Sequence, residues 1–241
     1  MRTTYSIGMA GAALIGALAL GPLQAAADTI DWTNWTDFTE SGSTPGTATG
    51  TTGNGIGVSY TGEVHGVFLN TIDWATAGGG TTFSGGMVGN APPSSGGIVQ
   101  LFGGPSGASQ TPVLNTITFS TPVTNPVMAI WSLGQSGIPA SFVFNQTPAL
   151  QSGGPSVEFA GNSISVTGNT VNGAEGNGTV EFLGTFQSIS WTNPTYENWY
   201  GFTVGIPAAV PEPGSITLLL AGIVAVGFTV GRRNRLAAHA A

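Results

Sequence analysis

The central part of this chain, residues 28–209 and termed the body, contains one histidine, His65, in the segment Glu63-Val64-His65-Gly66. A Ser-His-acid triad needs a serine and a carboxylate beside the histidine, and the sequence has no Gly-x-Ser-x-Gly turn to present that serine. Glu63 and His65 would share one face of a strand and form half of a metal site, but no second half is visible. We therefore expect His65 to be a surface residue without a catalytic role.

Three glutamates are candidates for the catalytic carboxylates of a glycoside hydrolase. Glu158, Glu181 and Glu197 lie on expected strands or turns, and two facing carboxylates would suit a glycoside hydrolase. Their spacing selects no pair, so a hydrolase stays an alternative, and we expect no enzyme.

An acidic cluster near the start of the body could supply oxygen ligands to Ca²⁺. Its members are Asp28, Asp31, Asp37 and Glu40. The cluster lacks the Asp-x-Asp-x-Asp loop of a typical calcium site. Ca²⁺ is the one candidate cofactor, and the metal ligands are otherwise unknown.

Aromatic residues could stack on sugars, because large amphipathic rings fit the apolar faces of pyranoses. The candidate rings are Trp32, Trp35, Trp74, Trp131, Trp191, Tyr196, Trp199 and Tyr200. Most of them must fill the core, and Trp131 and Trp191 are the expected core members. Tyr196 and Trp199, which follow Asn193-Pro194, are the expected exposed pair and the candidate sugar-stacking residues.

The charge composition excludes several classes of function. Only 6% of the 241 residues are charged, and no Lys or Arg lies between Thr3 and Gly231. Nucleic-acid binding needs basic side chains to neutralise phosphates, so it is excluded for the body. The absence of Cys removes disulfides, thiolate metal sites and cysteine nucleophiles.

The N-terminus has the parts of a secretory signal peptide. Arg2 precedes an apolar run from Ile7 to Leu20, and the small residues Ala25 and Ala27 precede Asp28. Signal peptidase reads small residues at those two positions, so residues 1–27 are predicted to be removed before Asp28.

The C-terminus combines a short motif, an apolar stretch and a basic cluster. Pro211-Glu212-Pro213 is followed by an apolar run from Ser215 to Gly231, and then by Arg232, Arg233 and Arg235. As a helix, the 18 residues from Gly214 to Gly231 would rise about 27 Å, which is just enough to cross a thin bilayer. The positive-inside rule places the arginines in the cytoplasm and the body outside.

This tail closely resembles the PEP-CTERM sorting signal of Gram-negative bacteria, here over residues 210–235. The resemblance implies that an exosortase recognises Pro211, Glu212 and Pro213, that residues 215–231 form a transmembrane helix, and that the three arginines act as the cytoplasmic stop. It also implies export from an exopolysaccharide-producing cell, with transient anchoring in the cytoplasmic membrane. The tail has also been catalogued as the C-terminal part of ice-binding proteins. The tail therefore predicts where the protein is sorted, but it does not predict the activity of the body.

The body has the two-residue periodicity of strands. About ten short runs rich in β-branched and aromatic residues are separated by Gly, Pro, Asn and Ser clusters. The runs are 56–60, 64–69, 98–102, 113–119, 127–133, 140–145, 163–167, 179–183, 186–191 and 199–206. They predict an all-β antiparallel sandwich or jelly roll, with helices only in the signal peptide and the tail. The Gly- and Thr-rich stretch from Ser41 to Gly55 is predicted to be a surface loop.

The leading hypothesis is a non-enzymatic exported protein with a structural or adhesive role at the cell surface or in the exopolysaccharide matrix. Exosortase, signal peptidase and exopolysaccharide are the expected partners. A carbohydrate-binding module is the first alternative, and a glycoside hydrolase is the second.

Overall fold

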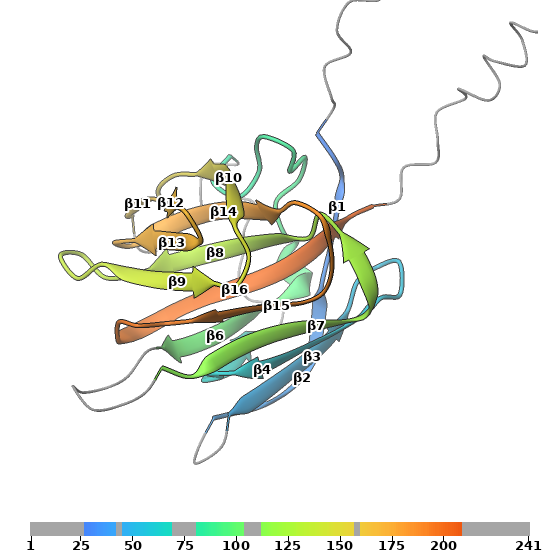
Figure 1. Ribbon diagram of the computed structural model, residues 1–241, viewed down its shortest axis with the longest axis horizontal. Coiled ribbons are helices and arrows are strands. Elements are labelled where there is room, and N and C mark those ends of the chain that lie inside the picture. The colour runs from blue at the N-terminus through green and yellow to red at the C-terminus, as the bar shows by residue number, and fades with distance from the viewer. Residues whose placement is uncertain (1–26, 42–44, 69–80, 104–111, 157–159, 209–241) are drawn as a thin grey trace, which may run out of the picture.

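The computed structural model describes residues 27–41, 45–68, 81–103, 112–156 and 160–208, which fold into two stacked β-sheets (Figure 1). Within those ranges no helix is long and apolar enough to cross a membrane. The helical element among them is the short 3-10 turn η1 (Ser94–Gly96). The all-β prediction is confirmed for this part of the chain. The predicted helices in residues 1–27 and 215–231 lie outside it.

The first sheet has eight strands. Its main order is β10 (Pro148–Gly153), β14 (Gly176–Phe182), β8 (Val127–Leu133), β16 (Glu197–Pro207), β6 (Ile98–Gly103) and β5 (Gly66–Phe68). β1 (Ile30–Trp32) also pairs with β16, and β11 (Asn162–Ser163) pairs with β14. The pairing of β11 with β14 is parallel, and the other described pairings in this sheet are antiparallel.

The second sheet also has eight strands, all paired antiparallel. Their order is β12 (Ser165–Thr167), β13 (Thr170–Gly173), β9 (Ala140–Phe144), β15 (Thr185–Thr192), β7 (Leu114–Thr124), β4 (Gly57–Gly62), β3 (Gly46–Thr51) and β2 (Asn34–Thr39). The predicted loop from Ser41 to Gly55 is wrong in its middle, because residues 46–51 form β3. Pairing with β2 and β4 stabilises this Gly- and Thr-rich strand despite its weak sequence signal.

The main core lies between the two sheets and is rich in aromatic rings. Trp191 of the second sheet stacks against Tyr60 with ring centroids 5.7 Å apart. The same indole meets Phe202 of the first sheet edge to face at 5.2 Å. Phe144 and Phe182 form a similar contact between the sheets at 4.9 Å. Since the body has no Lys or Arg for internal ion pairs, these rings supply a large part of its cohesion.

A second apolar cluster covers the outer side of the first sheet. It contains Ile30, Trp32, Phe83, Val88, Val127, Ala129 and Trp131. Every residue of β8 is consequently buried, as the apolar run 127–133 predicts for a central strand. The prediction that Trp131 and Trp191 are core residues is confirmed, since each is 1% exposed. They belong, however, to different clusters.

A bulge interrupts the pairing of β14 with β8. The register shifts between Gly176 and Gly178, and Asn177 lies at the shift. The Asn177 Oδ1 accepts a hydrogen bond of 2.9 Å from the backbone N–H of Ser132, whose φ of 58° is in the left-handed region. The buried Asn177 side chain therefore satisfies backbone groups that the bulge would otherwise leave unpaired.

Both ends of the described body lie at the same end of the sandwich. Ile30 of β1 pairs with Pro207 of β16, and the N–H of Ala208 donates to the carbonyl of Thr29 at 2.7 Å. Figure 1 shows β1 beginning and β16 ending on one side of the molecule. The opposite end carries the turn from β15 into β16 and the start of β7.

Candidate functional site

A buried polar cluster lies at the end of the sandwich away from the chain ends. Glu63 follows β4, Asn115 lies near the start of β7, Asn193 follows β15 and Glu197 begins β16. The antiparallel order brings these four strand ends together, although Glu63 and Asn193, for example, are 130 positions apart in sequence. Glu63 is 7% exposed and Glu197 is 2% exposed, so two carboxylates lie inside the protein at this end.

Two amide side chains hold the carboxylate of Glu63. Its Oε2 accepts a hydrogen bond from Asn115 Nδ2 at 3.3 Å and another from Asn193 Nδ2. The Asn115 Oδ1 accepts from the backbone N–H of Glu63 at 2.9 Å and from the hydroxyl of Tyr60. This network fixes the connection after β4 against β7 and the β15–β16 turn.

Two tyrosine hydroxyls lie close enough to the cluster to respond to its charge. Burial, and secondarily the negative charge of Glu63, raise the pKa of Tyr60 well above its ordinary value. The pKa of Tyr200 is also raised, by burial first and then by the charges of Glu63, Tyr60 and Glu197, while the nearby amide of Asn193 acts in the opposite direction. Both phenols are therefore neutral at physiological pH, and both carboxylates lie within electrostatic range of Tyr200.

Glu63 and His65, which were predicted to share one face of a strand, lie in different environments. The residues between Gly62 and Gly66 lie outside β4 and β5, so two-residue alternation does not apply to them. Glu63 is buried, whereas His65 is exposed as predicted.

The two described candidate glutamates for glycoside hydrolysis, Glu181 and Glu197, do not converge. Glu158 lies outside the described residues. Glu181 pairs with Val127, which pairs in turn with Gly205 of β16. Glu197 lies at the other end of β16, about 27 Å away at 3.4 Å per residue. Glu181 and Glu197 are therefore too far apart to flank one glycosidic bond, which needs a separation of about 5–10 Å.

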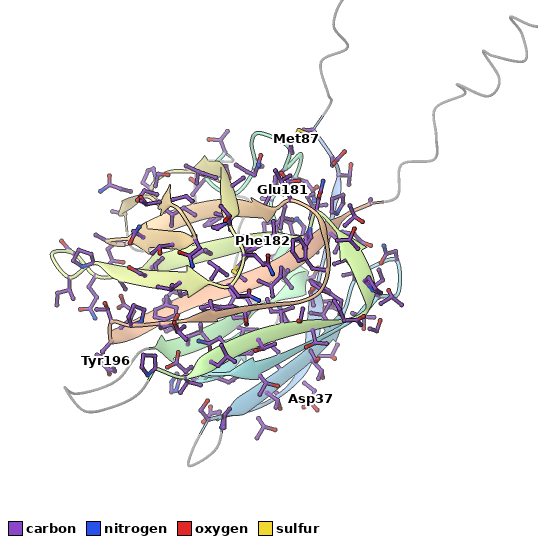
Figure 2. The ribbon with its side chains drawn as sticks, viewed as in Figure 1. Asp37, Met87, Glu181, Phe182 and Tyr196 are labelled. Carbon is purple, nitrogen blue, oxygen red and sulfur yellow. The ribbon has the colours of Figure 1, made fainter. Side chains whose placement is uncertain are left out.

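Glu181 instead belongs to a network near the N-terminal end of the described chain. Gln151 donates to the Glu181 carboxylate at 2.9 Å and accepts from the N–H of Met87 at 2.8 Å. Figure 2 shows Glu181 and Met87 on the same side of the molecule, beside the start of β1. Burial, followed by the negative charge of Asp28, raises the pKa of Glu181.

The predicted calcium cluster near the start of the body is dispersed. Asp31 accepts hydrogen bonds from the N–H groups of Gly53 and Asn54 at 2.9 and 2.7 Å. Asp37 is exposed on β2 and accepts from its neighbour Phe38. In the described ranges no group of three or more His, Asp or Glu could hold a metal ion. Binding of Ca²⁺ at Asp28, Asp31, Asp37 and Glu40 stays a prediction.

The two candidate sugar-stacking rings have different surroundings. Tyr196 lies in the β15–β16 turn and is 42% exposed, and Figure 2 shows it at the lower left tip of the molecule. Trp199 is half-buried and packs against the second apolar cluster. The other described candidate rings, Trp32, Trp35, Trp131, Trp191 and Tyr200, are buried, and Trp74 lies outside the described residues. Sugar stacking at Tyr196 and Trp199 remains a prediction.

Sequence reasoning missed a face of the second sheet that is covered by hydroxyl groups. We call it the hydroxyl face, and its residues are Thr47, Thr49, Ser59, Thr61, Thr116, Thr118, Ser188 and Ser190. The strand register aligns them in two rows across β3, β4, β7 and β15. Thr49, Ser59, Thr118 and Ser188 form one row, and the other four residues form the second.

The hydroxyl face is turned outward and is uncharged. Six of its eight side chains are exposed, and the two others, Thr116 and Ser190, are half-buried. The alternate residues of the same strands, including Ala48, Tyr60 and Ile117, are buried in the core. In a β-sheet the backbone positions that carry these hydroxyl groups are spaced by about 4.8 Å between strands and by about 7 Å along them. The acidic residue nearest in register is Asp37, which pairs with Thr49 at the edge of the sheet.

Comparison with protein families gives a match at the C-terminus, which lies outside the described residues. The PEP-CTERM protein-sorting motif matches residues 209–235. The chain carries a PEP-CTERM sorting signal. The match confirms the resemblance seen in the sequence, and it marks the chain as an exported, exosortase-sorted protein that is anchored in a membrane before processing. No curated protein and no solved structure matches the chain.

The matched segment contains the residues predicted to carry sorting. Pro211, Glu212 and Pro213 lie near its start, and the arginines 232, 233 and 235 lie at its end. The described body ends at Ala208, immediately before the matched segment. The start of the sorting signal is therefore directly connected to strand β16.

Proposed function

We propose that this PEP-CTERM chain is a non-enzymatic structural or adhesive protein of the cell surface or exopolysaccharide matrix of a Gram-negative bacterium. In this proposal signal peptidase removes residues 1–27, and an exosortase reads Pro211, Glu212 and Pro213 before it removes the membrane helix. The body then adheres to neutral regions of the polysaccharide. The hydroxyl face is the observation that carries the adhesive role.

A surface of Thr and Ser suits a neutral polysaccharide for a simple chemical reason. Each hydroxyl both donates and accepts hydrogen bonds, as the hydroxyls of a sugar do. One such bond contributes only about 1 kcal/mol, so binding must come from many contacts along a repeating polymer. Without Lys or Arg the body cannot use ion pairs with acidic sugars, and raising the salt from about 0.05 to about 0.5 M should leave adhesion unchanged.

Co-sedimentation with exopolysaccharide from the exporting cells tests this proposal. The double variant Thr49→Val, Thr118→Val removes two hydroxyls from one row while keeping a β-branched shape that strands favour. We expect it to lose most of the bound fraction. Thr167→Val, on an exposed position of β12 at the far edge of the same sheet, is the matched control and should bind as the unmodified chain does.

A carbohydrate-binding module centred on Tyr196 is the second candidate, because that ring is exposed. Tyr196→Ala separates the two candidates. If this variant abolishes co-sedimentation while the Thr49→Val, Thr118→Val variant binds normally, the module replaces adhesion through the hydroxyl face.

A further inference from the structure

The buried carboxylates of Glu63 and Glu197 belong to a body that has no permanently charged cation. The full sequence contains no Lys or Arg between Thr3 and Gly231, so neither carboxylate can meet an ammonium or guanidinium group of the body. Removing two carboxylates from water into the same buried cluster is costly, and their charges also repel each other. A bound cation would lower both costs.

The same cluster contains polar oxygens that make no hydrogen bond of good geometry among the described residues. They are the Oδ1 of Asn193 and the hydroxyl of Tyr200, which interacts with the Asn193 amide but does not meet that geometry. Asn193 is 1% exposed and Tyr200 is fully buried, so water at the surface does not form hydrogen bonds with these oxygens. Asn193 is directed into the cluster, because its Nδ2 donates to the Glu63 carboxylate. Buried oxygens of this kind normally have a partner, which is a second indication of a missing ligand.

The chemistry of these groups selects the class of ligand. Two carboxylates, one amide carbonyl and one phenol are all hard oxygen donors. Ca²⁺ takes six to eight such oxygens in flexible geometry and accepts carboxylates, amide carbonyls and water together. The absence of nitrogen and sulfur ligands in this set disfavours zinc and copper.

We propose that the cluster of Glu63, Asn193, Glu197 and Tyr200 binds one Ca²⁺ ion. The carboxylates supply the negative charge, the Asn193 Oδ1 supplies a neutral ligand, and the Tyr200 hydroxyl faces the same space. The ion joins the connection after β4 to the start of β16 and so stabilises the end of the sandwich remote from the sorting signal. This site is separate from the acidic cluster at Asp28 to Glu40, and it does not depend on the proposed adhesive function.

Calcium binding is tested on the full chain in detergent micelles after removal of metals with EGTA. Equilibrium dialysis with Ca²⁺ should show one bound ion per chain. The thermal unfolding midpoint, followed by circular dichroism, should rise by about 5–10 °C when Ca²⁺ is about 100-fold above its dissociation constant. Mg²⁺ at the same concentration should produce a much smaller shift, because it demands a tighter octahedral geometry.

Variants assign the ion to the cluster. Glu197→Gln should weaken Ca²⁺ binding at least tenfold and remove the thermal shift, and Glu63→Gln should do the same if the first variant does not fold. Asp37→Asn removes an exposed carboxylate outside the cluster and should keep both signals.

Three results would overturn the proposal. One is an unmodified chain that binds no Ca²⁺, which would mean that protons and the chain's own donors stabilise the two carboxylates. The others are a Glu197→Gln variant that binds Ca²⁺ as tightly as before, and a loss of the bound ion in Asp37→Asn.

Discussion

Trp35 and Trp191 are two buried indoles of the same core that differ in one hydrogen bond, and the difference predicts that replacement by Phe destabilises the first more than the second. Each is 1% exposed. The Nε1–H of Trp35 donates to the hydroxyl of Thr203 at 3.1 Å, whereas the Nε1–H of Trp191 makes no hydrogen bond among the described residues. Replacing either indole by Phe removes a similar ring area of about 50 Å², which is worth about 1 kcal/mol.

The polar contribution then decides the outcome. Trp35→Phe also removes the bond to Thr203 and leaves that buried hydroxyl without its donor, which costs about 1–3 kcal/mol more. Trp191→Phe removes an N–H that has no described partner, so a gain of similar size should offset the lost ring area. We expect Trp35→Phe to be less stable than Trp191→Phe by at least about 2 kcal/mol.

Guanidinium denaturation followed by far-ultraviolet circular dichroism measures this difference without relying on tryptophan fluorescence. The variant with the lower midpoint at unchanged slope should be Trp35→Phe. Equal midpoints, or a larger loss in Trp191→Phe, would show that packing around the rings and not the indole N–H controls stability. Such a result would refute the reasoning.

Three further predictions concern the bulge, a buried carboxyl and the sorting signal. Asn177→Ala should destabilise the body by about 1–3 kcal/mol in a denaturant titration, because the backbone N–H of Ser132 loses its acceptor inside the protein; an unchanged midpoint would contradict this. Since the pKa of Glu181 is raised in the folded state, the native protein binds more protons than the unfolded chain, and stability should fall as the pH rises above the ordinary value of 4.5. Glu181→Gln should flatten that decline, whereas the exposed-site variant Asp37→Asn should keep it. Glu212→Ala should leave membrane insertion intact but block trimming, so immunoblots should show the uncleaved chain in the cytoplasmic membrane, and normal trimming would exclude recognition through Glu212.

The regular parts of the fold could be predicted from local sequence. All ten runs predicted as strands overlap strands of the structure, and the run 127–133 has the bounds of β8, because an apolar strand buried on both faces gives a continuous signal. Two of the missed strands, β3 and β10, have weak local patterns. β3 consists of Gly, Thr and Ala, and β10 begins with Pro148, so both depend on pairing with their neighbours.

The polar sites could be predicted much less well. Glu63, Asn115 and Asn193 come from separate strand ends, and no spacing in the sequence reports that they meet. The hydroxyl face needs the register of four strands, which single-strand periodicity does not provide. One signal was available in advance: a body with ten acidic residues, one histidine and no Lys or Arg has few groups of its own to neutralise a buried carboxylate.

The junction between β16 and the sorting signal has a mechanical consequence. β16 is hydrogen-bonded to β8 on one side and to β6 and β1 on the other, and the matched tail begins two residues after the strand ends. A pull on the tail therefore acts along the axis of an interior strand and loads the hydrogen bonds of both flanks at the same time, in shear. An edge strand peeled from its end would lose these bonds one after another at much lower force. While the chain is anchored through its C-terminus before processing, a pull on the body therefore cannot unzip β16 from one side.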